Sequence, residues 1–512
     1  MARVPFRANL SALAFPFLSE FSGQSVVVKQ IDQNFIASQI SKDDLDKDIG
    51  IPQLIYCHNV IPTAQGYQSI SFPTLISAIS GVTNFAGVFS VVDSTTSSRA
   101  YVGYTAAGVF YYSLDPYYSW TLIGTFASLA GKQHTAAYIN GITYAYFANV
   151  GCYKFNFTTH TLDSVTLTGL TAAEVLGIVS VQGYLLAWSK SAIAWSSLID
   201  PTDFTPSLVT GAGGGSVQGA KGDIVCCVSH TIGLVIYTSQ NAVAAPVSGN
   251  SRYPFNFREL VGSGGVASID LITADANTGN HYAYTTSGMQ LISLQQSQTI
   301  MPELTDFLAG KVFEDFDTTS RTFSVTSLSA TMKKRMSLIS DRYLVISYGI
   351  DSFTHALLYD IVYKRWGKFR EEHIEVFEFS LLAAEVVETP RRSIAFLTSS
   401  GEVKVVEIDT RDTEADGVVI LGKYQQIRSR NFVLQEVTVE NIPEFASQFQ
   451  CADMWSMDGK NTTGIDDGYL QVNQGMLRRY TFRREAVNHT LYFRGAFHLV
   501  SLEVDGHVGA RR

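Results

Sequence analysis

A short turn pattern recurs along the middle of this chain and limits the folds open to it. Each copy has an apolar residue, then Thr, Ser or Ala, two further residues, and a residue that is usually Gly or Asn. A hairpin reverses where a residue can take positive φ, and a Thr or Ser hydroxyl can bond the local backbone. The pattern therefore predicts a series of β-hairpins. The copies begin at Tyr104, Phe147, Trp188, Tyr237, Tyr284 and Leu397.

The spacing of the copies predicts the architecture. The first five lie 41 to 49 residues apart, and the 113 residues from Tyr284 to Leu397 hold one further, longer-looped copy at about residues 342–360. A period near 45 fits four short strands with their turns, which is the blade of a β-propeller. We expect an all-β chain with a β-propeller of six to eight blades, seven being favoured. The alternative is a generic β-rich protein whose hairpins look alike.

The sequence on either side of the repeat differs from it, which suggests the domain organisation. We expect the β-propeller to span residues 76–415. Longer alternating runs, such as residues 432–440, predict an additional C-terminal antiparallel β-domain over residues 416–512. Residues 1–75 lack the repeat, and we expect them to form an N-terminal arm and a segment that closes the propeller.

Composition narrows the classes of function. Charged residues make up only 16% of the chain, below the roughly 25% usual for globular domains. The net charge of −9 argues against a general nucleic-acid binder, which needs a basic stripe to displace phosphate counterions. It still allows a surface that DNA slides past.

The cysteines and the apolar runs bear on the compartment. The cysteines are five in number and irregularly spaced, so we expect reduced core residues folded in a cytoplasm. The apolar residues 10–18 resemble a signal peptide, but Pro16 interrupts them. No stretch reaches the roughly 18 uninterrupted apolar residues of a membrane span. The cysteines are Cys57, Cys152, Cys226, Cys227 and Cys451.

Several segments carry residue types used in active sites, but none has the spacing that such a site needs. The glycine-rich residues 211–223 lack the Lys-Ser or Lys-Thr pair of a phosphate-binding loop, so we expect a flexible loop between blades. We expect the basic residues 331–336 to be a solvated turn. Cys57 and His58 have no second pair of ligands nearby. We therefore predict no catalytic, metal or cofactor site.

Residues 113–120 resemble the Asp-box hairpin of sialidase-like propellers, with Tyr117 in place of its glycine and Ser119 in place of its threonine. An Asp-box is a structural hairpin, so it supports the fold and not glycosidase activity. A sialidase would also need an arginine cluster, an acid and a tyrosine nucleophile, and the sequence offers no such set. We predict that the chain is not an enzyme.

Three stretches resemble the nozzle or hub proteins (tail tubular or tail accessory proteins) of short-tailed, podovirus-type bacteriophages. These stretches are residues 56–67, 195–206 and 253–265. In such proteins an early Asn, Pro and Gly segment leads into the propeller, and the Trp-Ser-x-x-x-Asp-Pro-Thr-Asp-Phe run resembles an element between blades. The residues that match these features are Asn59, Pro62, Gly66, Asp200, Pro201, Asp203 and Phe204.

The resemblance implies a structural virion protein. About six copies would form a ring below the portal and the adaptor, extend the DNA channel, help to hold and release the genome, and carry tail fibres or a tail tip. Double-stranded DNA would pass without sequence-specific binding, and no membrane insertion is implied. The protein would fold in the host bacterial cytoplasm and reside in the virion tail. A ring of this kind needs head-to-tail contacts that close.

Two other functions remain open at this stage. One is a receptor- or glycan-binding propeller at the tail tip, which should be a trimer without a through-channel. The other is a host-type propeller that serves as a monomeric platform for protein partners. Under each of them, we expect Cys57, His58 and Asn59 to form a structural entry into the β-core, with Asn59 bonding backbone groups in a turn before Pro62.

Overall fold

The fold is all-β. The computed structural model describes residues 4–9, 53–63, 66–70, 74–77 and most of 84–508. The interruptions within the last range are residues 95, 97, 115–119, 251–252, 302–303, 305–307, 309–312, 327–331, 351, 364, 382–390, 408–414, 426–431, 442–448, 458–461 and 475. The elements are antiparallel β-strands, with short 3-10 turns at η2 (Ala127–Leu129) and η3 (Ile269–Leu271).

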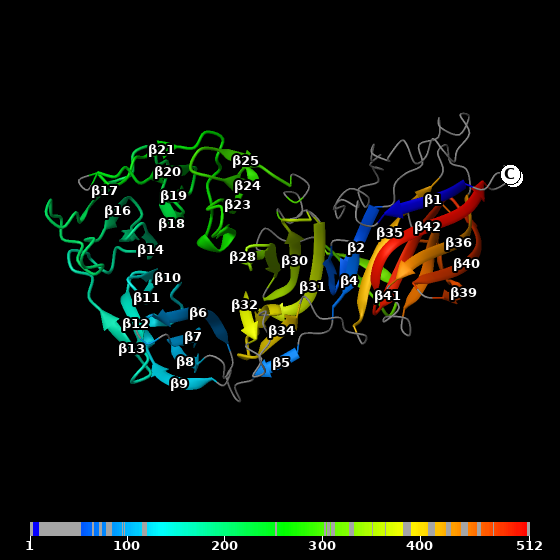
Figure 1. Cartoon of the computed structure of the whole chain (residues 1–512), viewed down its shortest axis with the longest axis horizontal. Helices are drawn as coiled ribbons and strands as arrows, with labels where there is room; N and C mark the ends of the chain where they lie inside the picture. Colours follow the sequence, from blue (N-terminus) through cyan, green and yellow to red (C-terminus); the bar gives the residue numbers. More distant parts are fainter. Residues whose placement is uncertain are drawn as a thin grey trace.

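The strands of the ring fall into seven antiparallel groups of four, units 1 to 7, of which units 1 and 2 share one eight-stranded sheet and unit 6 is part of an eleven-stranded one; Figure 1 shows the groups arranged around a ring. In each of them, strands that are neighbours in sequence pair with each other. Units 1 to 4 are β6 (Phe85–Asp93), β7 (Ser98–Thr105), β8 (Val109–Leu114), β9 (Thr121–Thr125); β10 (His134–Ile139), β11 (Ile142–Phe147), β12 (Gly151–Asn156), β13 (Thr161–Val165); β14 (Gly177–Val181), β15 (Tyr184–Trp188), β16 (Ala192–Trp195), β17 (Gly213–Ser216); and β18 (Ile224–His230), β19 (Gly233–Thr238), β20 (Ala242–Pro246), β21 (Arg258–Glu259). Units 5 to 7 are β22 (Ile272–Ala274), β23 (His281–Thr285), β24 (Gly288–Ile292), β25 (Ser297–Thr299); β28 (Lys333–Ile339), β29 (Tyr343–Gly349), β30 (Phe353–Asp360), β31 (Arg365–His373); and β32 (Glu375–Leu381), β33 (Arg391–Leu397), β34 (Val403–Glu407) with β5 (Thr74–Ser77).

The N-terminal part of the chain completes the seventh unit. Strand β5 pairs antiparallel with β34, so that Leu75 lies opposite Lys404. Unit 7 thus takes three strands from the end of the repeat and its fourth strand from a segment more than 300 residues earlier in the sequence. Because units 7 and 1 are neighbours in the ring, β5 lies where the two ends of the repeat meet (Figure 1).

The second strand of a unit is the most deeply buried. Every residue of β15, β19 and β29 is buried, and their sequences are nearly continuous apolar runs: Tyr-Leu-Leu-Ala-Trp, Gly-Leu-Val-Ile-Tyr-Thr and Tyr-Leu-Val-Ile-Ser-Tyr-Gly. A strand reads as a continuous apolar run when both of its faces are covered. One apolar cluster joins residues of units 3, 4 and 5, including Trp188, Tyr237 and Ala283. Neighbouring units therefore cover each other.

The recurring turns lie at the same place in each unit, between the second and third strands. The expected hydroxyl bonds are present: Thr105 Oγ1 accepts the Val109 N–H at 3.1 Å, and Thr238 Oγ1 accepts the Asn241 N–H at 2.9 Å. Positive φ does not always fall on the predicted residue. Gly108 has a φ of 79°, but in the second unit Asn149, with a φ of 61°, takes the place expected for Gly151.

The glycine-rich stretch corrects one expectation. Residues 213–216 form β17, the outermost strand of unit 3, and not a flexible loop. Glycine suits this strand because a Cβ at Gly213 would lie 3.0 Å from the Trp195 ring, and one at Gly214 would lie 2.8 Å from the Ile193 carbonyl oxygen. The glycines allow the strand to pack closely against β16.

Most of the remaining strands form two sheets beside the ring (Figure 1), and segments from both ends of the sequence contribute to them. The first sheet has the order β3 (Val60–Pro62), β4 (Tyr67–Ser69), β42 (His498–Val508), β36 (Phe432–Asn441), β40 (Leu477–Ala486), β39 (Tyr469–Gln474), with β1 (Val4–Asn9) also paired to β42. The second has the order β2 (Gln53–His58), β35 (Gly417–Gln425), β41 (Asn488–Gly495), β37 (Gln450–Ser456), β38 (Gly464–Asp467). Buried side chains from both sheets, including Val437 and Phe493, form one core between them.

Strand pairing and side-chain contacts link the ring to these sheets. Val60 in β3 pairs with Lys368 in β31, so the sheet of unit 6 continues into the first sheet. The hairpin of β26 (Phe313–Asp317) and β27 (Thr322–Thr326) also reaches the second sheet, where Arg321 pairs with Asp467 at 2.6 Å and lies over the Tyr492 ring. In the described part of the chain, no helix has the length and hydropathy of a membrane span.

Candidate functional site

A cavity of about 890 Å³ lies at the centre of the ring. The first strand of each of the seven units lines it, so the wall takes residues from β6, β10, β14, β18, β22, β28 and β32. The volume lies within the range of small-molecule sites, about 300–1,000 Å³. Both charged and apolar side chains face this space.

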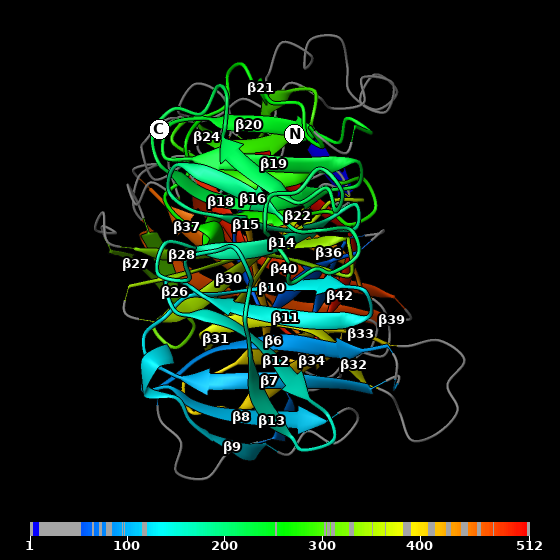
Figure 2. The same cartoon turned by 90° about the vertical axis from the view of Figure 1, so that its left-hand side faces the viewer.

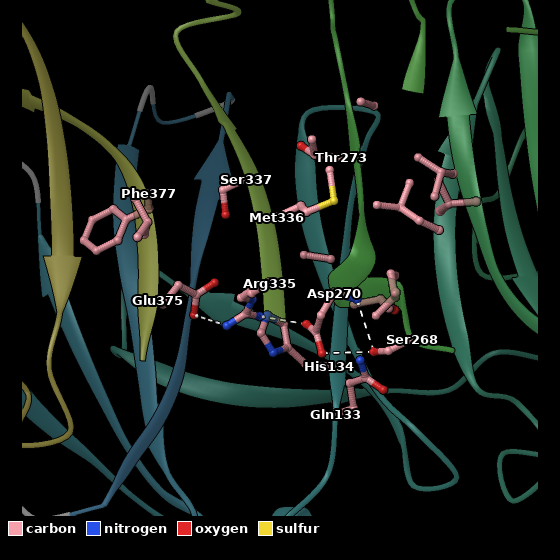
Figure 3. Close-up of a pocket in the computed structure, with 18 of the residues that line it drawn as sticks. Gln133, His134, Ser268, Asp270, Thr273, Arg335, Met336, Ser337, Glu375 and Phe377 are labelled. Atoms are coloured by element: carbon pink, nitrogen blue, oxygen red, sulfur yellow. Dashed lines mark hydrogen bonds and ion pairs between the residues drawn. The ribbon is translucent and has the colours of Figure 1, made fainter. Parts of the chain in front are cut away.

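Arg335 of β28 reaches into the cavity between two carboxylates (Figure 3). Its guanidinium nitrogens lie 3.3 Å from an oxygen of Asp270 and 3.4 Å from an oxygen of Glu375. Asp270 lies in η3, just before unit 5, whereas Glu375 begins β32 of unit 7. We refer to Asp270, Arg335 and Glu375 as the central triad.

Backbone and hydroxyl donors hold the two carboxylates of the central triad. Ser268 Oγ donates to Asp270 at 3.0 Å, and the backbone N–H of Val88 in unit 1 donates to Glu375 at 2.9 Å. The central triad therefore links units 5, 6 and 7, and through Val88 it crosses the seam to unit 1. Side-chain interactions at the axis therefore join units whose central-triad residues are far apart in the sequence.

Burial and mutual attraction govern the charges of the central triad. Burial raises the pKa of the Glu375 carboxyl, and the nearby Arg335 guanidinium opposes that rise. For Arg335, burial acts to lower the pKa, but the charges of Glu375 and Asp270 outweigh it and raise the pKa above its ordinary value. Arg335 is therefore a fixed positive charge that favours the ionised form of Glu375.

A neutral histidine lies beside the central triad. His134, the first residue of β10, has its Nδ1 atom 2.7 Å from the Tyr104 hydroxyl. Burial, with the positive charge of Arg335, lowers the pKa of His134 to about 3, and burial raises the pKa of Tyr104. Tyr104 thus keeps its proton, and a hydrogen bond joins its hydroxyl group to the neutral imidazole of His134.

The central triad corrects a second expectation. The basic residues 331–336 were expected to be a solvated turn, but residues 333–339 form β28, the inner strand of unit 6, and Arg335 points into the cavity. Residue 331 lies outside the described residues. One signal available in the sequence was missed: Arg335 stands in the first strand of a repeat unit, which is the strand that lines the cavity. Asp270 and His134 carry no such local signal, because each occurs singly in its segment, and Glu375 is one of several acidic residues between positions 371 and 378.

The N-terminal residues that carry the resemblance lie where the chain passes from one of the two sheets beside the ring to the other. Asn59, with a φ of 50°, separates β2 in one sheet from β3 in the other. Its backbone oxygen accepts the Ile70 N–H at 2.9 Å, and its side-chain oxygen accepts the Arg370 N–H at 3.4 Å. Pro62 ends β3, and Gly66 closes the following turn by donating its N–H to Thr63 Oγ1.

The other matched residues lie in the loop between β16 and β17. Asp200 accepts the N–H and hydroxyl of Thr202, Pro201 lies in the turn between these two residues, and Asp203 accepts the Thr205 N–H. Phe204 is only 2% exposed and packs in a cluster shared by units 2 and 3. The structure therefore separates the two groups of matched residues, with Asn59, Pro62 and Gly66 beside the ring and the others within it.

The Cys-His pair lies inside the β-core. Cys57 is fully buried, and burial raises the pKa of its thiol to about 12. His58 Nδ1 lies 3.2 Å from the Tyr56 hydroxyl. All five cysteines are free and buried. Across the described residues, no group of three or more His, Cys, Asp or Glu side chains is placed to hold a metal ion.

No protein-family model matches the sequence, and no curated protein matches it at the significance required.

Proposed function

We propose that this chain is a structural virion protein, the building block of a ring-shaped nozzle or hub in the tail of a short-tailed bacteriophage. In this proposal the seven units are the blades of one β-propeller that β5 closes, and the two sheets beside it form the additional β-domain. About six copies would make the ring, attach to the adaptor above and carry fibres or a tip below. The chain would act as a scaffold and not as an enzyme.

The central triad is the observation that carries this proposal. Its two acids and one arginine neutralise one another in part and join units 5 to 7 and, through Val88, unit 1. Such an arrangement favours a rigid, closed unit over a reactive centre, since a catalytic acid or base needs a proton that it can exchange with a substrate.

The central triad also bears on the path that DNA would take in this proposal. The major groove of B-form DNA is by itself about 12 Å wide, and the whole duplex is wider. The space at the axis of this ring is a cavity of about 890 Å³, and the Arg335 side chain crosses it. DNA would therefore pass through a channel enclosed by several copies and not through the axis of one chain. The net charge of −9 supports passage without adhesion.

Native mass tests this proposal. Light scattering and electron-microscope class averages of the purified chain, alone and mixed with portal and adaptor, should give a ring of about six copies with an open lumen. A compact trimer would contradict the nozzle. A chain that stays monomeric both alone and in the presence of portal and adaptor would also contradict it.

The cavity itself favours a second candidate, a receptor- or glycan-binding propeller at the tail tip. Its volume suits a small ligand, and polar groups such as Gln133, Ser229 and Thr273 line it. This function predicts a trimer that binds host polysaccharide, with binding lost when Thr273→Trp fills the cavity. Equal binding by Thr273→Trp and the unchanged chain would remove the cavity from consideration.

A further inference from the structure

One short stretch of the chain contacts both the ring and the two sheets beside it. We refer to the described residues 53–63, 66–70 and 74–77 as the strap. Strand β2 of the strap pairs with β35 in the second sheet, β3 with β31 of unit 6, β4 with β42 in the first sheet, and β5 with β34 of unit 7. Figure 1 shows β2 and β4 between the ring and the C-terminal strands. The strap therefore passes from the sheets beside the ring into the ring itself.

Strand β3 of the strap contributes side chains to two separate cores. Successive side chains of a strand point to opposite faces of its sheet. Val60 is fully buried and belongs to the core between the two sheets, together with Phe493. The next residue, Ile61, is 1% exposed and belongs to the core of units 6 and 7, together with Phe369 and Phe396. The ring and the sheets therefore cannot separate at β3 without exposing one of these two side chains to water.

Hydrogen bonds also hold the strap to both parts. The side-chain oxygen of Asn59 accepts the backbone N–H of Arg370 in β31 at 3.4 Å. Ser69 Oγ donates to the backbone oxygen of Phe497 at 3.1 Å and accepts the N–H of the same residue at 2.8 Å. Asn59 and Ser69 are themselves buried, and a buried polar group that loses its partner costs free energy. These bonds therefore resist the same separation.

Two glycines allow the strap to lie close to its neighbours on both sides. A Cβ at Gly367 of β31 would lie 2.3 Å from the backbone oxygen of Val60, and one at Gly417 of β35 would lie 2.6 Å from the Cβ of Ser69. Gly367 belongs to the ring and Gly417 to the second sheet. Glycine inside a strand often marks such a close approach of another backbone. Both parts of the molecule are therefore fitted closely to the strap.

The place of β3 in the ring suits this double role. The strands of the units run across the thickness of the ring, as Figure 2 shows for the units nearest the viewer. Strand β3 lies beside β31, the outermost strand of unit 6, and continues the sheet of that unit towards β4 and β42. One sheet therefore runs without interruption from the ring into the first sheet.

We infer that the strap makes the ring and the two sheets one rigid body, so that a movement imposed on the sheets is transmitted to the ring. Two parts of one chain move relative to each other by default unless their interface is large and apolar. Here one strand supplies apolar side chains to both cores, which removes that freedom. The units that receive the strap, 6 and 7, also supply Arg335 and Glu375 of the central triad. The inference applies to a single copy and does not depend on the proposed function.

Distance measurements between two electron-spin labels test the inference. Labels on Val362→Cys in the ring and Tyr469→Cys in the first sheet report the distance between the two parts, since both positions are exposed and the native cysteines are buried. The labelled chain is diluted with unlabelled chain, so that labels on different copies do not contribute. Without a further substitution, the labels should give one narrow distance. Gly367→Ala should lose it and give a broad distribution, because the added methyl group pushes β3 away from β31.

Two matched variants serve as controls. Gly215→Ala adds the same methyl group to a strand of the ring where it meets no atom within 4 Å. Arg321→Met removes the other link described above, the ion pair with Asp467, whose side chain is 71% exposed and screened by solvent. Both controls should keep the narrow distance. Ile61→Ala, a milder change in the strap, should broaden the distribution, and it replaces Gly367→Ala if far-ultraviolet circular dichroism shows that the latter has lost its sheets.

Three results would overturn the inference. A broad distribution in the labelled chain without further substitution would show that the ring and the sheets move relative to each other. A narrow distance in both Gly367→Ala and Ile61→Ala would show that other contacts fix the two parts. Loss of the narrow distance in Arg321→Met alone would assign the joint to the β26–β27 hairpin. None of these results changes the native mass, which tests the proposed function separately.

Discussion

Replacing Arg335 with methionine should destabilise the ring by about 2–3 kcal/mol. Methionine keeps much of the apolar stem but removes the charge that compensates Asp270 and Glu375. Loss of one partner of a buried ion pair costs about 3–5 kcal/mol, whereas an exposed pair contributes at most about 1 kcal/mol. The Glu375 side chain is 14% exposed, Arg335 23% and Asp270 37%, so solvent screens part of the interaction and the expected cost falls below the buried range.

The assay is unfolding in urea, monitored by tryptophan fluorescence. The change in the free energy of unfolding is calculated from the shift of the urea midpoint, with the dependence of that free energy on urea concentration held constant. Arg335→Met combined with Glu375→Gln should recover about 1–2 kcal/mol, because the second change removes the uncompensated charge. Arg484→Met is the matched control: Arg484 pairs with Asp466 at 2.6 Å, but the two side chains are 42% and 36% exposed. Its cost should stay below about 1 kcal/mol.

The loss of unfolding free energy caused by Arg335→Met should also depend on pH. Burial holds the pKa of Glu375 above its unfolded value, and removal of Arg335 removes the charge that opposes this rise. A raised carboxyl pKa favours the folded state below the unfolded pKa of about 4.3 and loses that contribution as pH rises through the folded pKa. The deficit should therefore be largest near neutral pH and shrink towards pH about 4. A cost equal to that of Arg484→Met, with no gain from Glu375→Gln, would refute the view of the central triad as a joint between units.

Three further predictions follow from packing. A Cβ at Gly265 would lie 2.1 Å from the backbone oxygen of Ser239, so Gly265→Ala should lower the free energy of unfolding in urea by about 3 kcal/mol. A Cβ at Gly215 would meet no atom within 4 Å, so Gly215→Ala should change that free energy by less than about 0.5 kcal/mol. Equal effects of the two substitutions would contradict the close approach at Gly265. Phe204→Ala should cost about 3–5 kcal/mol because this ring fills the core between units 2 and 3; the exposed Leu208→Ala should be nearly neutral, and a neutral Phe204→Ala would refute the packing. All five thiols are buried, so a thiol reagent should modify the native chain slowly and the unfolded chain at all five cysteines; rapid native labelling would contradict their burial.

The hairpins of the ring could be predicted because their chemistry is local. The hydroxyl of Thr238 bonds the backbone three residues later, and the same four-residue arrangement recurs in Ser189 and Thr285. A turn of this kind depends on its own residues, so a pattern in the sequence suffices to place it.

The misread segments show where local reasoning fails. Residues 213–216 are rich in glycine, which is typical of loops, but the adjoining Trp195 ring and the Ile193 backbone make glycine the residue that fits a strand there. Arg335 belongs to a basic cluster that is typical of a solvated surface, yet Asp270 and Glu375, distant in sequence, give it partners in the cavity. In both cases the deciding contacts are tertiary.

Pairing between distant segments had the weakest signal in the sequence. Strand β5 pairs with β34, but nothing in residues 74–77 specifies the partner strand. That β2, β3 and β4 belong to sheets built mainly from residues 417–508 was not part of the predicted organisation at all. Short strands of three to six residues carry too little pattern to define a register over such separations.

The pairing of first strands with last ones has a consequence for synthesis. In β1 and β42, Val4 lies opposite Gly506, and in β4 and β42, Tyr67 lies opposite Leu499. Strands β1 and β4 therefore leave the ribosome more than 400 residues before β42, and contacts of such long separation form slowly. Only a polypeptide that includes β42 can fill these ladders. Interrupted translation would leave open strand edges, and such products would be poor substitutes for the finished subunit in any symmetric assembly.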